Sequence, residues 1–155
     1  MADMQQTFLS RTVEIAAPAQ LVWSVMADVE RWPEWTASVS RIVRLTPGPL
    51  AVGSRLRIHQ PKLAPATWRV VEVERDRYFV SESVTPGLRV IAHHSIEPVG
   101  AKSRVTLSVR FEGLFAVLLA RLTRNLNKRY LTMEAVGLKE RCESLAVRVG
   151  TTSQS

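Results

Sequence analysis

One long apolar stripe near the C-terminus constrains the fold more than any other feature of the sequence. Between Gly113 and about Val147, apolar residues recur at steps of three and four, which places them on one face of an α-helix. The stripe contains Phe115, Leu118, Leu119, Leu122, Leu126, Tyr130, Met133, Leu138, Cys142 and Leu145. No proline interrupts it, so we predict a single helix of roughly 33 residues, about 50 Å long. Such a helix needs an apolar partner surface of similar length.

The start of this predicted helix differs from the rest of it. From Leu114 to Ala120 nearly every residue is apolar, which predicts a turn buried beneath the remainder of the chain. Arg121 then ends the apolar run far short of the roughly 20 residues that a membrane-spanning helix requires. We therefore expect no stable membrane insertion.

Most of the chain before the stripe is typical of short strands. Thr7 to Ala16 is expected to form the first strand, Pro18 begins a helix that ends near Asp28, and residues 30–35 form a turn or second short helix. Six further strands, separated by turns rich in proline and glycine, are predicted at residues 39–45, 54–60, 67–74, 78–84, 88–97 and 103–111. Their short connections favour an antiparallel meander.

These elements together predict an α+β fold. A seven-stranded, curved antiparallel sheet would wrap around the long C-terminal helix, with two short helices after the first strand. Because the short helices lie at one end, the space between sheet and long helix need not fill, and an internal cavity is expected. Residues 7–147 are predicted to form a single domain and residues 148–155 a polar tail, in which Gly150 to Ser155 are expected to lack fixed structure.

Composition narrows the class of protein. The 155 residues suffice for one domain with a substantial core. The first ten residues are polar and contain no apolar segment like that of a signal peptide, and a single cysteine, Cys142, excludes an internal disulfide. We therefore expect a cytoplasmic protein. The net charge of +7 arises from scattered basic residues without a dense basic run, so nucleic acid is not an expected partner.

Two segments resemble a known family. Residues 15–23 read IAAPAQLVW and residues 27–35 read ADVERWPEW; Val52-Gly53-Ser54 and Pro86-Gly87 also match. From Phe8 to Leu145 the chain resembles the START-like, Bet v 1-like (SRPBCC) superfamily, within it the polyketide cyclase/dehydrase and lipid-transport group. The resemblance implies a helix-grip fold whose cavity binds an apolar or aromatic molecule. Members include lipid carriers and aromatase/cyclases, and many bacterial single-domain members have no assigned activity, so a pocket is implied more firmly than a reaction.

Strand alternation predicts which histidine faces the cavity. If Val105, Leu107 and Val109 face the long helix, the neighbouring strand presents inward either Val90, Ala92, His94 and Ile96 or Ile91, His93 and Ser95. The first set is favoured because it is the more apolar, which places His94 inward and His93 outward. An inward His94 could bind a ligand oxygen or act as a general acid or base. The alternative is a core histidine hydrogen-bonded to a neighbouring strand.

Further cavity residues follow from the same alternation. We expect ligand contacts from Trp35 as a lid and from Ile58, Gln60, Trp68, Phe79, Ser81 and Leu107 on the strands, with Leu122, Leu126, Tyr130 and Met133 as the helical floor. Core packing would explain the apolar members equally well, and a strand-end cap would explain Gln60. Glu82 is predicted to point outward, although a bulge would reverse this and set it beside His94.

Other chemistry has little support in the sequence. No nucleophile elbow or phosphate-binding loop is present, and His59, His93 and His94 lack the spacing of metal ligands, so no metal and no cofactor are predicted. We favour a protein that binds or transports a small hydrophobic ligand, either lipid, aromatic or polyketide-like. The alternatives are a polyketide cyclase/dehydratase using His94, and a partner-binding module with a filled interior and an exposed apolar patch. Either a monomer or a homodimer would suit these functions.

Overall fold

The computed structural model describes residues 7–152, and side chains as far as residue 149. The chain forms, in order, β1 (Phe8–Ile15), α2 (Ala19–Ala27), the 3-10 helix η1 (Val29–Glu34), β2 (Arg41–Arg44), β3 (Arg55–His59), β4 (Ala66–Glu74), β5 (Tyr78–Thr85), β6 (Leu88–Val99), β7 (Lys102–Glu112), α3 (Ala116–Leu122) and α4 (Arg124–Thr152). Each predicted strand is present, with bounds within a few residues of those expected.

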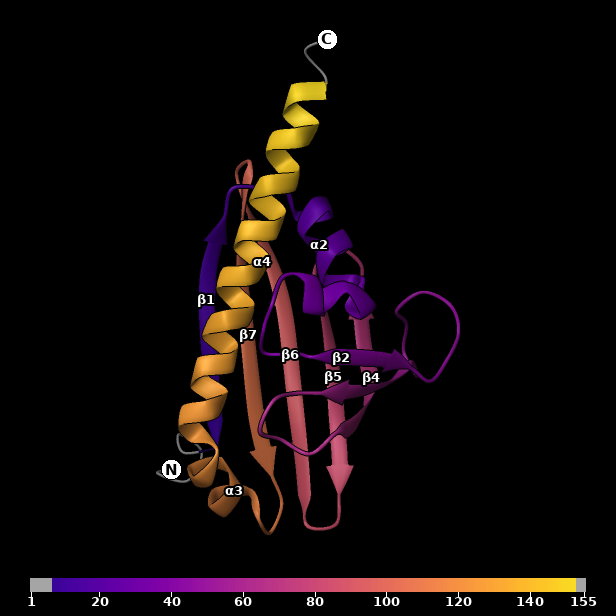
Figure 1. Ribbon diagram of the computed structural model, residues 1–155, viewed down its shortest axis with the longest axis vertical. Helices are drawn as coiled ribbons and strands as arrows, with labels where there is room; N and C mark the ends of the chain where they lie inside the picture. Colours follow the sequence, from indigo (N-terminus) through magenta and orange to yellow (C-terminus); the bar gives the residue numbers. More distant parts are fainter. Residues whose placement is uncertain (1–6, 153–155) are drawn as a thin grey trace.

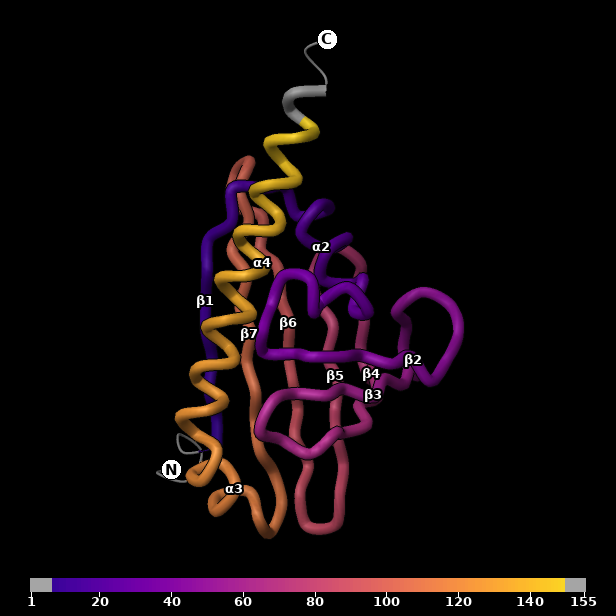
Figure 2. The backbone as a smooth tube through the Cα atoms, in the orientation of Figure 1, coloured from indigo at the N-terminus to yellow at the C-terminus, as the bar shows by residue number. Residues whose placement is uncertain are grey.

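All seven strands belong to one antiparallel sheet with the order β1-β7-β6-β5-β4-β3-β2. Consecutive strands are neighbours from β2 to β7, and β1 pairs with β7 at the opposite edge. In Figure 1, α4 runs the length of the sheet beside β1 and β7. Figure 2 shows β2 and β3 crossing in front of β4, β5 and β6, so the sheet curves strongly. The predicted α+β fold, a curved sheet wrapped on a long C-terminal helix, is confirmed.

The short helices close one end of this sheet. Proline at position 18 has an extended backbone (φ −70°, ψ 154°) and stands immediately before α2, where the missing proline N–H removes no helical hydrogen bond. The face of α2 that carries Val22, Trp23 and Met26 is buried against the sheet. The indole Nε1 of Trp32 in η1 donates to the carbonyl of Met26 at 3.0 Å, which fixes that ring over the interior. The segment resembling the family therefore makes one end of the core.

The C-terminal helix is not the single rod that its apolar stripe predicts. It consists of α3 and α4, which meet at Thr123 (φ −105°, ψ 6°). The hydroxyl of Thr123 donates to the carbonyl of Leu119 at 2.6 Å and accepts from Asn127 Nδ2 at 2.9 Å. The Leu119 carbonyl also accepts from the Thr123 backbone N–H at 3.0 Å, so these side-chain bonds reinforce the junction at which the chain changes direction.

The burial predicted for Leu114 to Ala120 is also wrong. Only Ala116 and Ala120 of this segment are buried, whereas Leu114, Phe115 and Leu118 are 85%, 46% and 57% exposed. This part of the chain lies at the end of the sheet, where Phe111 and a few partly buried residues of β6 and β7 are the apolar partners. That small surface covers one face of α3 and leaves the other facing outward.

The opposite end of the helix extends further than expected. Helix α4 continues to Thr152 and so includes much of the stretch predicted to be a polar tail. Residues 153–155 of that stretch lie outside the described part of the chain.

Candidate functional site

A cavity of about 640 Å³ lies between the curved sheet and the helices. Its size falls within the roughly 300–1,000 Å³ typical of small-molecule sites. Most side chains around it are apolar, and they come from nearly every element, including Trp32 (η1), Ile42 (β2), Ile58 (β3), Trp68 (β4), Phe79 (β5), Ala92 (β6), Leu107 (β7), Leu119 (α3) and Leu131 (α4). The interior is therefore hollow, contrary to what a partner-binding module with a filled core would require.

Eight of the twelve residues predicted from the sequence to contact a ligand contribute to the cavity wall. They are Ile58, Gln60, Trp68, Phe79, Ser81, His94, Leu107 and Tyr130. All except Tyr130 were placed by strand alternation, because alternate side chains of a strand point to the same face of the sheet.

Two predicted residues of the helical floor, Leu126 and Met133, are not among the residues that line the cavity. The α4 face turned toward the cavity instead carries Asn127, Tyr130, Leu131 and Glu134. A step of one residue rotates a side chain by about 100° around a helix, so Leu126 and Met133 lie beside this face. Leu122, also predicted for the floor, is 71% exposed because it belongs to the outer face of α3.

The remaining exception is Trp35, which was expected to form a lid. It is half-buried, its ring lies 5.6 Å from that of Trp32, and it does not line the cavity. Its backbone is pressed against α4 at Gly137: a Cβ placed on that glycine would come within 2.0 Å of the Trp35 carbonyl oxygen. This contact with the helix takes Trp35 away from the cavity mouth.

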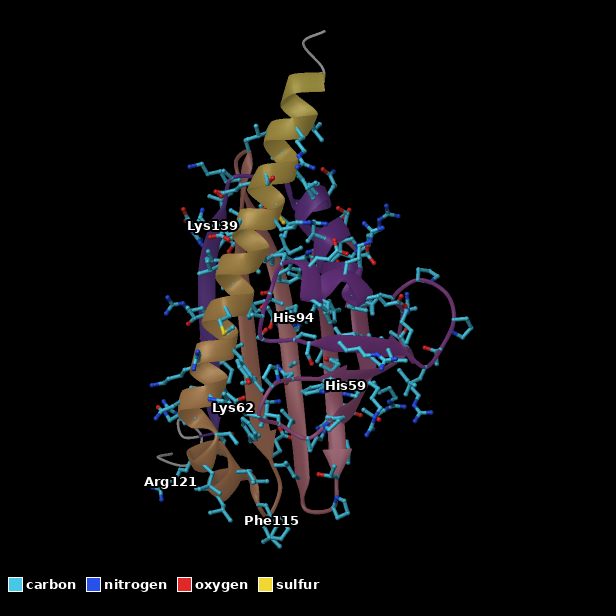
Figure 3. All side chains as sticks on the ribbon, in the orientation of Figure 1. His59, Lys62, His94, Phe115, Arg121 and Lys139 are labelled. Carbon is cyan, nitrogen blue, oxygen red and sulfur yellow. The ribbon has the colours of Figure 1, made fainter. Side chains whose placement is uncertain are left out.

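His94 and Glu134 form a polar pair in this mostly apolar wall. His94 Nε2 lies 2.8 Å from Glu134 Oε1, and both side chains are largely buried. The His94 ring stacks on Phe79 with 4.5 Å between ring centroids and a 6° interplanar angle, and Trp32 lies 5.3 Å away. These contacts hold the imidazole in one orientation, and Figure 3 shows His94 in the middle of the molecule between the sheet and α4.

The pairing with Glu134 decides the tautomer of a neutral His94. An ionised carboxylate only accepts hydrogen bonds, so Nε2 carries the proton and donates it to Glu134. The lone pair is then on Nδ1, a buried atom without a hydrogen-bond partner in the described part of the chain. An unpaired buried acceptor can accept a hydrogen bond from any ligand group that reaches it or, in an enzyme, remove a proton.

Glu134 is a candidate site residue that sequence reasoning missed. A signal was available, because Glu134 follows the predicted floor residue Tyr130 by four positions and must share its helix face. A carboxylate on an otherwise apolar face is unusual and indicates a buried partner.

Two other polar groups of the wall already have partners. The Tyr130 hydroxyl donates to the carbonyl of Pro61, and Gln60 Nε2 donates to the carbonyl of Ser38 at 3.2 Å. Both bonds hold the β3–β4 loop close to the cavity rather than presenting free groups to a ligand.

The predicted outward orientation of Glu82 agrees with the structure. A register irregularity occurs between Val70 and Glu72 of β4, and not in β5, so the alternation of β5 persists. Ser81 consequently lines the cavity, while Glu82 pairs with Arg89 and Arg69 on the other face of the sheet. The hydrogen bond that Arg89 donates to Glu82 raises the pKa of Arg89. Glu82 and His94 thus form no pair.

His93 lies on the opposite face from His94. Its ring stacks on Tyr78 with 5.6 Å between centroids. Burial, together with the neighbouring His94, lowers the pKa of His93 below its usual 6.5. Among the described residues, no three His, Cys, Asp or Glu side chains come together in a way that could hold a metal ion. In that same part of the chain, no helix is both long enough and apolar enough to cross a membrane.

Comparison with solved structures identifies the same architecture. An aromatase/cyclase, Zhui, from Streptomyces sp. R1128 superimposes with a TM-score of 0.72 at 19% identity, covering 88% of this chain and 93% of that one. A START superfamily protein from Mycobacterium smegmatis has a TM-score of 0.70 at 20% identity, and the match covers 90% of this chain and 99% of that one. A hypothetical protein, jhp0584, from Helicobacter pylori has a TM-score of 0.74 at 17% identity, covering 88% of each.

Sequence comparison agrees with the structural likeness. No curated protein matches the sequence. A family described as polyketide cyclase/dehydrase and lipid transport matches residues 6–143, which is most of the chain. The chain therefore belongs to the polyketide cyclase/dehydrase and lipid-transport family.

Proposed function

We propose that this protein binds, and carries, a small hydrophobic ligand of lipid, aromatic or polyketide-like chemistry in its internal cavity. The observation that supports this most directly is the 640 Å³ cavity itself, whose wall is largely apolar. Apolar ligands gain free energy in such a site at roughly 25 cal/mol for each Å² removed from water. The family match supports the same class of ligand.

The wall also indicates what the ligand should carry. Trp32, Trp68 and Phe79 offer flat faces suited to rings or to an extended chain. Among the described residues Nδ1 of His94 has no hydrogen-bond partner, so a ligand hydroxyl group that reached it would satisfy it. We expect a mostly apolar molecule with a single hydroxyl directed at His94 to bind better than its deoxy analogue, by about five- to tenfold.

Titration calorimetry with fatty acids, sterols and aromatic polyketides tests the proposal, with the fluorescence of Trp32 and Trp68 as a second readout. Saturable binding of one ligand per chain is expected. Ala92→Phe would place a ring inside the cavity and should weaken binding at least tenfold. Ile91→Phe, on the opposite face of β6, is the matched control and should leave it unchanged. Absence of saturable binding across the panel would refute the proposal.

A second candidate function is a cyclase or dehydratase, and the His94–Glu134 pair is the observation that favours it. In such a reaction Nδ1 would remove a proton from a carbon next to a carbonyl and later return it to a departing hydroxyl, which leaves as water. Glu134 would stabilise the imidazolium formed in between.

The two functions can be separated by comparing adjacent histidines. If the protein is an enzyme, His94→Ala should lower turnover of a polyketide substrate by about 10²- to 10⁴-fold. Binding should change far less. His93→Ala, on the other face of the sheet, should retain turnover. Equal turnover in both variants would exclude His94 from catalysis.

A further inference from the structure

The end of the molecule formed by α3 and the segment before it carries a set of exposed apolar side chains. Leu114, Phe115, Leu118 and Leu122 are 85%, 46%, 57% and 71% exposed, and they follow one another within nine residues. Scattered exposed apolar residues are normal, but four such large side chains in one short segment indicate an interaction surface. We call this set the α3 patch.

Helix α3 presents two chemically different faces. Ala116 and Ala120 pack on Phe111 and its neighbours, and Leu119 lines the cavity. Leu118 and Leu122, one helical turn apart, form the outer face with Arg121 between them. Figure 3 shows Phe115 and Arg121 at the same end of the molecule.

The segment that carries the α3 patch has charges of one sign, and the nearest carboxylate before it, Glu112, is paired with Arg89 and Arg110. From Gly113 to Met133 the sequence contains Arg121, Arg124, Lys128 and Arg129 and no acidic residue. None of these four forms an ion pair in the described part of the chain, whereas Arg89, Arg104 and Arg110 on the sheet each pair with a carboxylate. The cations near the patch thus remain available to an external anion.

We infer that the α3 patch docks the protein on a lipid bilayer that contains anionic headgroups. Apolar side chains at the centre with cations at the margin match an interface in which acyl chains lie beneath negative headgroups. A second copy of this chain fits less well, because it would bring two like-charged segments together. The proposal rests on the proposed function, and extends it by naming where the ligand enters.

The α3 patch is also adjacent to the cavity. Leu119 and Thr123 belong to the cavity wall and lie within the same helical segment as the exposed leucines. The Phe115 amide donates to the carbonyl of Gly87 at 3.0 Å, which ties the patch to the β5–β6 turn. That turn contributes Thr85 and Leu88 to the wall. Docking through α3 would therefore bring this end of the cavity to the membrane, where an apolar ligand could exchange without crossing water.

Vesicle flotation with the intact protein tests this inference. We expect binding to vesicles of phosphatidylcholine containing about one third phosphatidylglycerol, and far weaker binding to phosphatidylcholine alone. Leu118→Ser combined with Leu122→Ser should lower the partition coefficient about tenfold or more, since both side chains are exposed and replaceable without loss of core packing. Arg121→Gln should lower it about fivefold, and by less at high salt.

Two control variants match these changes elsewhere on the surface. Val52→Ser removes an apolar side chain that is 66% exposed on the β2–β3 connection. Arg75→Gln removes an exposed cation from the β4–β5 turn. Both should partition like the wild type. Ligand binding in free solution should persist in every variant, so its loss would count against the cavity function instead.

Three results would overturn the inference. One is absence of vesicle binding while ligand binding in solution is intact. The second is equal binding to neutral and anionic vesicles, which would remove the role of the cations. The third is a concentration-dependent dimer that Leu118→Ser with Leu122→Ser dissociates, which would show that a second copy covers the α3 patch.

Discussion

His94 Nε2 and Glu134 Oε1 lie 2.8 Å apart although 40 positions separate the two residues in the chain. The contact joins β6 to α4 across the mostly apolar interior and is the principal polar link between the sheet and the long helix at the cavity. It orients the imidazole and leaves Nδ1 unpartnered. Recognition of a ligand hydroxyl and proton transfer both depend on this arrangement.

The two side chains should be energetically coupled. Glu134→Leu leaves a buried Nε2–H without an acceptor and should lower the free energy of unfolding by about 1–3 kcal/mol, and His94→Leu should have a similar effect. The double variant removes both partners and should lose less than the sum of the two, by roughly 0.5–3 kcal/mol. Urea unfolding of the four proteins measures this.

The exposed pair Asp28 and Arg31, 3.4 Å apart at the start of η1, provides the control cycle. Its coupling should be about 0.5 kcal/mol or less, as for other pairs one turn apart on a helix surface. If the coupling energy measured for His94 and Glu134 were as small as that of the control pair, the contact between them would contribute no specific stabilisation.

Gly137→Ala should destabilise the protein although alanine favours helices by about 1 kcal/mol over glycine. The new Cβ would meet the Trp35 carbonyl oxygen at 2.0 Å and its carbon at 3.0 Å, both backbone atoms that cannot rotate away. We expect a net loss of about 1–3 kcal/mol, measured by thermal or urea unfolding. Val136→Ala, at the adjacent and 44% exposed position, should be near neutral. A Gly137→Ala protein more stable than the wild type would disprove the close contact.

The lowered pKa of His93 predicts a dependence of stability on pH. Since burial holds this pKa below 6.5, the unfolded chain takes up a proton near pH 6.5 that the native histidine does not. Native stability should therefore fall as the pH is lowered from 6.5 through the folded-state pKa. His93→Phe keeps the stacking with Tyr78 and removes the proton site, so its stability should fall less steeply over the same range. Urea midpoints at a series of pH values test this, and parallel curves would contradict it.

Cys142 should be inert in the native protein. The side chain is fully buried, and burial, with a smaller effect from Glu143, raises the pKa of its thiol to about 12. The thiolate is the reactive form, so a thiol reagent such as Ellman's reagent should react with the native protein only as fast as the chain unfolds. Reaction in urea should be rapid. Fast labelling of the native protein would show that this part of α4 opens to solvent.

Much of the cavity was predictable from the sequence because its wall is made mainly by strands. Alternation of period two assigned Trp68, Phe79 and His94 to the interior, and each lies there. That assignment needs only the geometry of an extended chain and one reference strand, without knowledge of which strand pairs with which. The turns rich in proline and glycine located the strand ends in the same way.

Which side chains of α3 and α4 line the cavity, and which are exposed, was decided by the tertiary structure. The periodicity of apolar residues does not reveal where a helix is interrupted. Here the helix is divided into α3 and α4 at Thr123, whose hydroxyl bonds to Leu119 and Asn127. Nor does that periodicity show which neighbours will cover the helix, so the exposure of Leu118 and Leu122 could not be predicted.

The sequence by itself determined the order of strands and helices and the face of each strand, because these depend on local periodicity and turn chemistry. The rotation of α4, which brings Glu134 to His94, was decided only on folding. It depends on the close approach of Trp35 to Gly137 and on the cavity that the curved sheet leaves open, and both are distances between residues far apart in the chain.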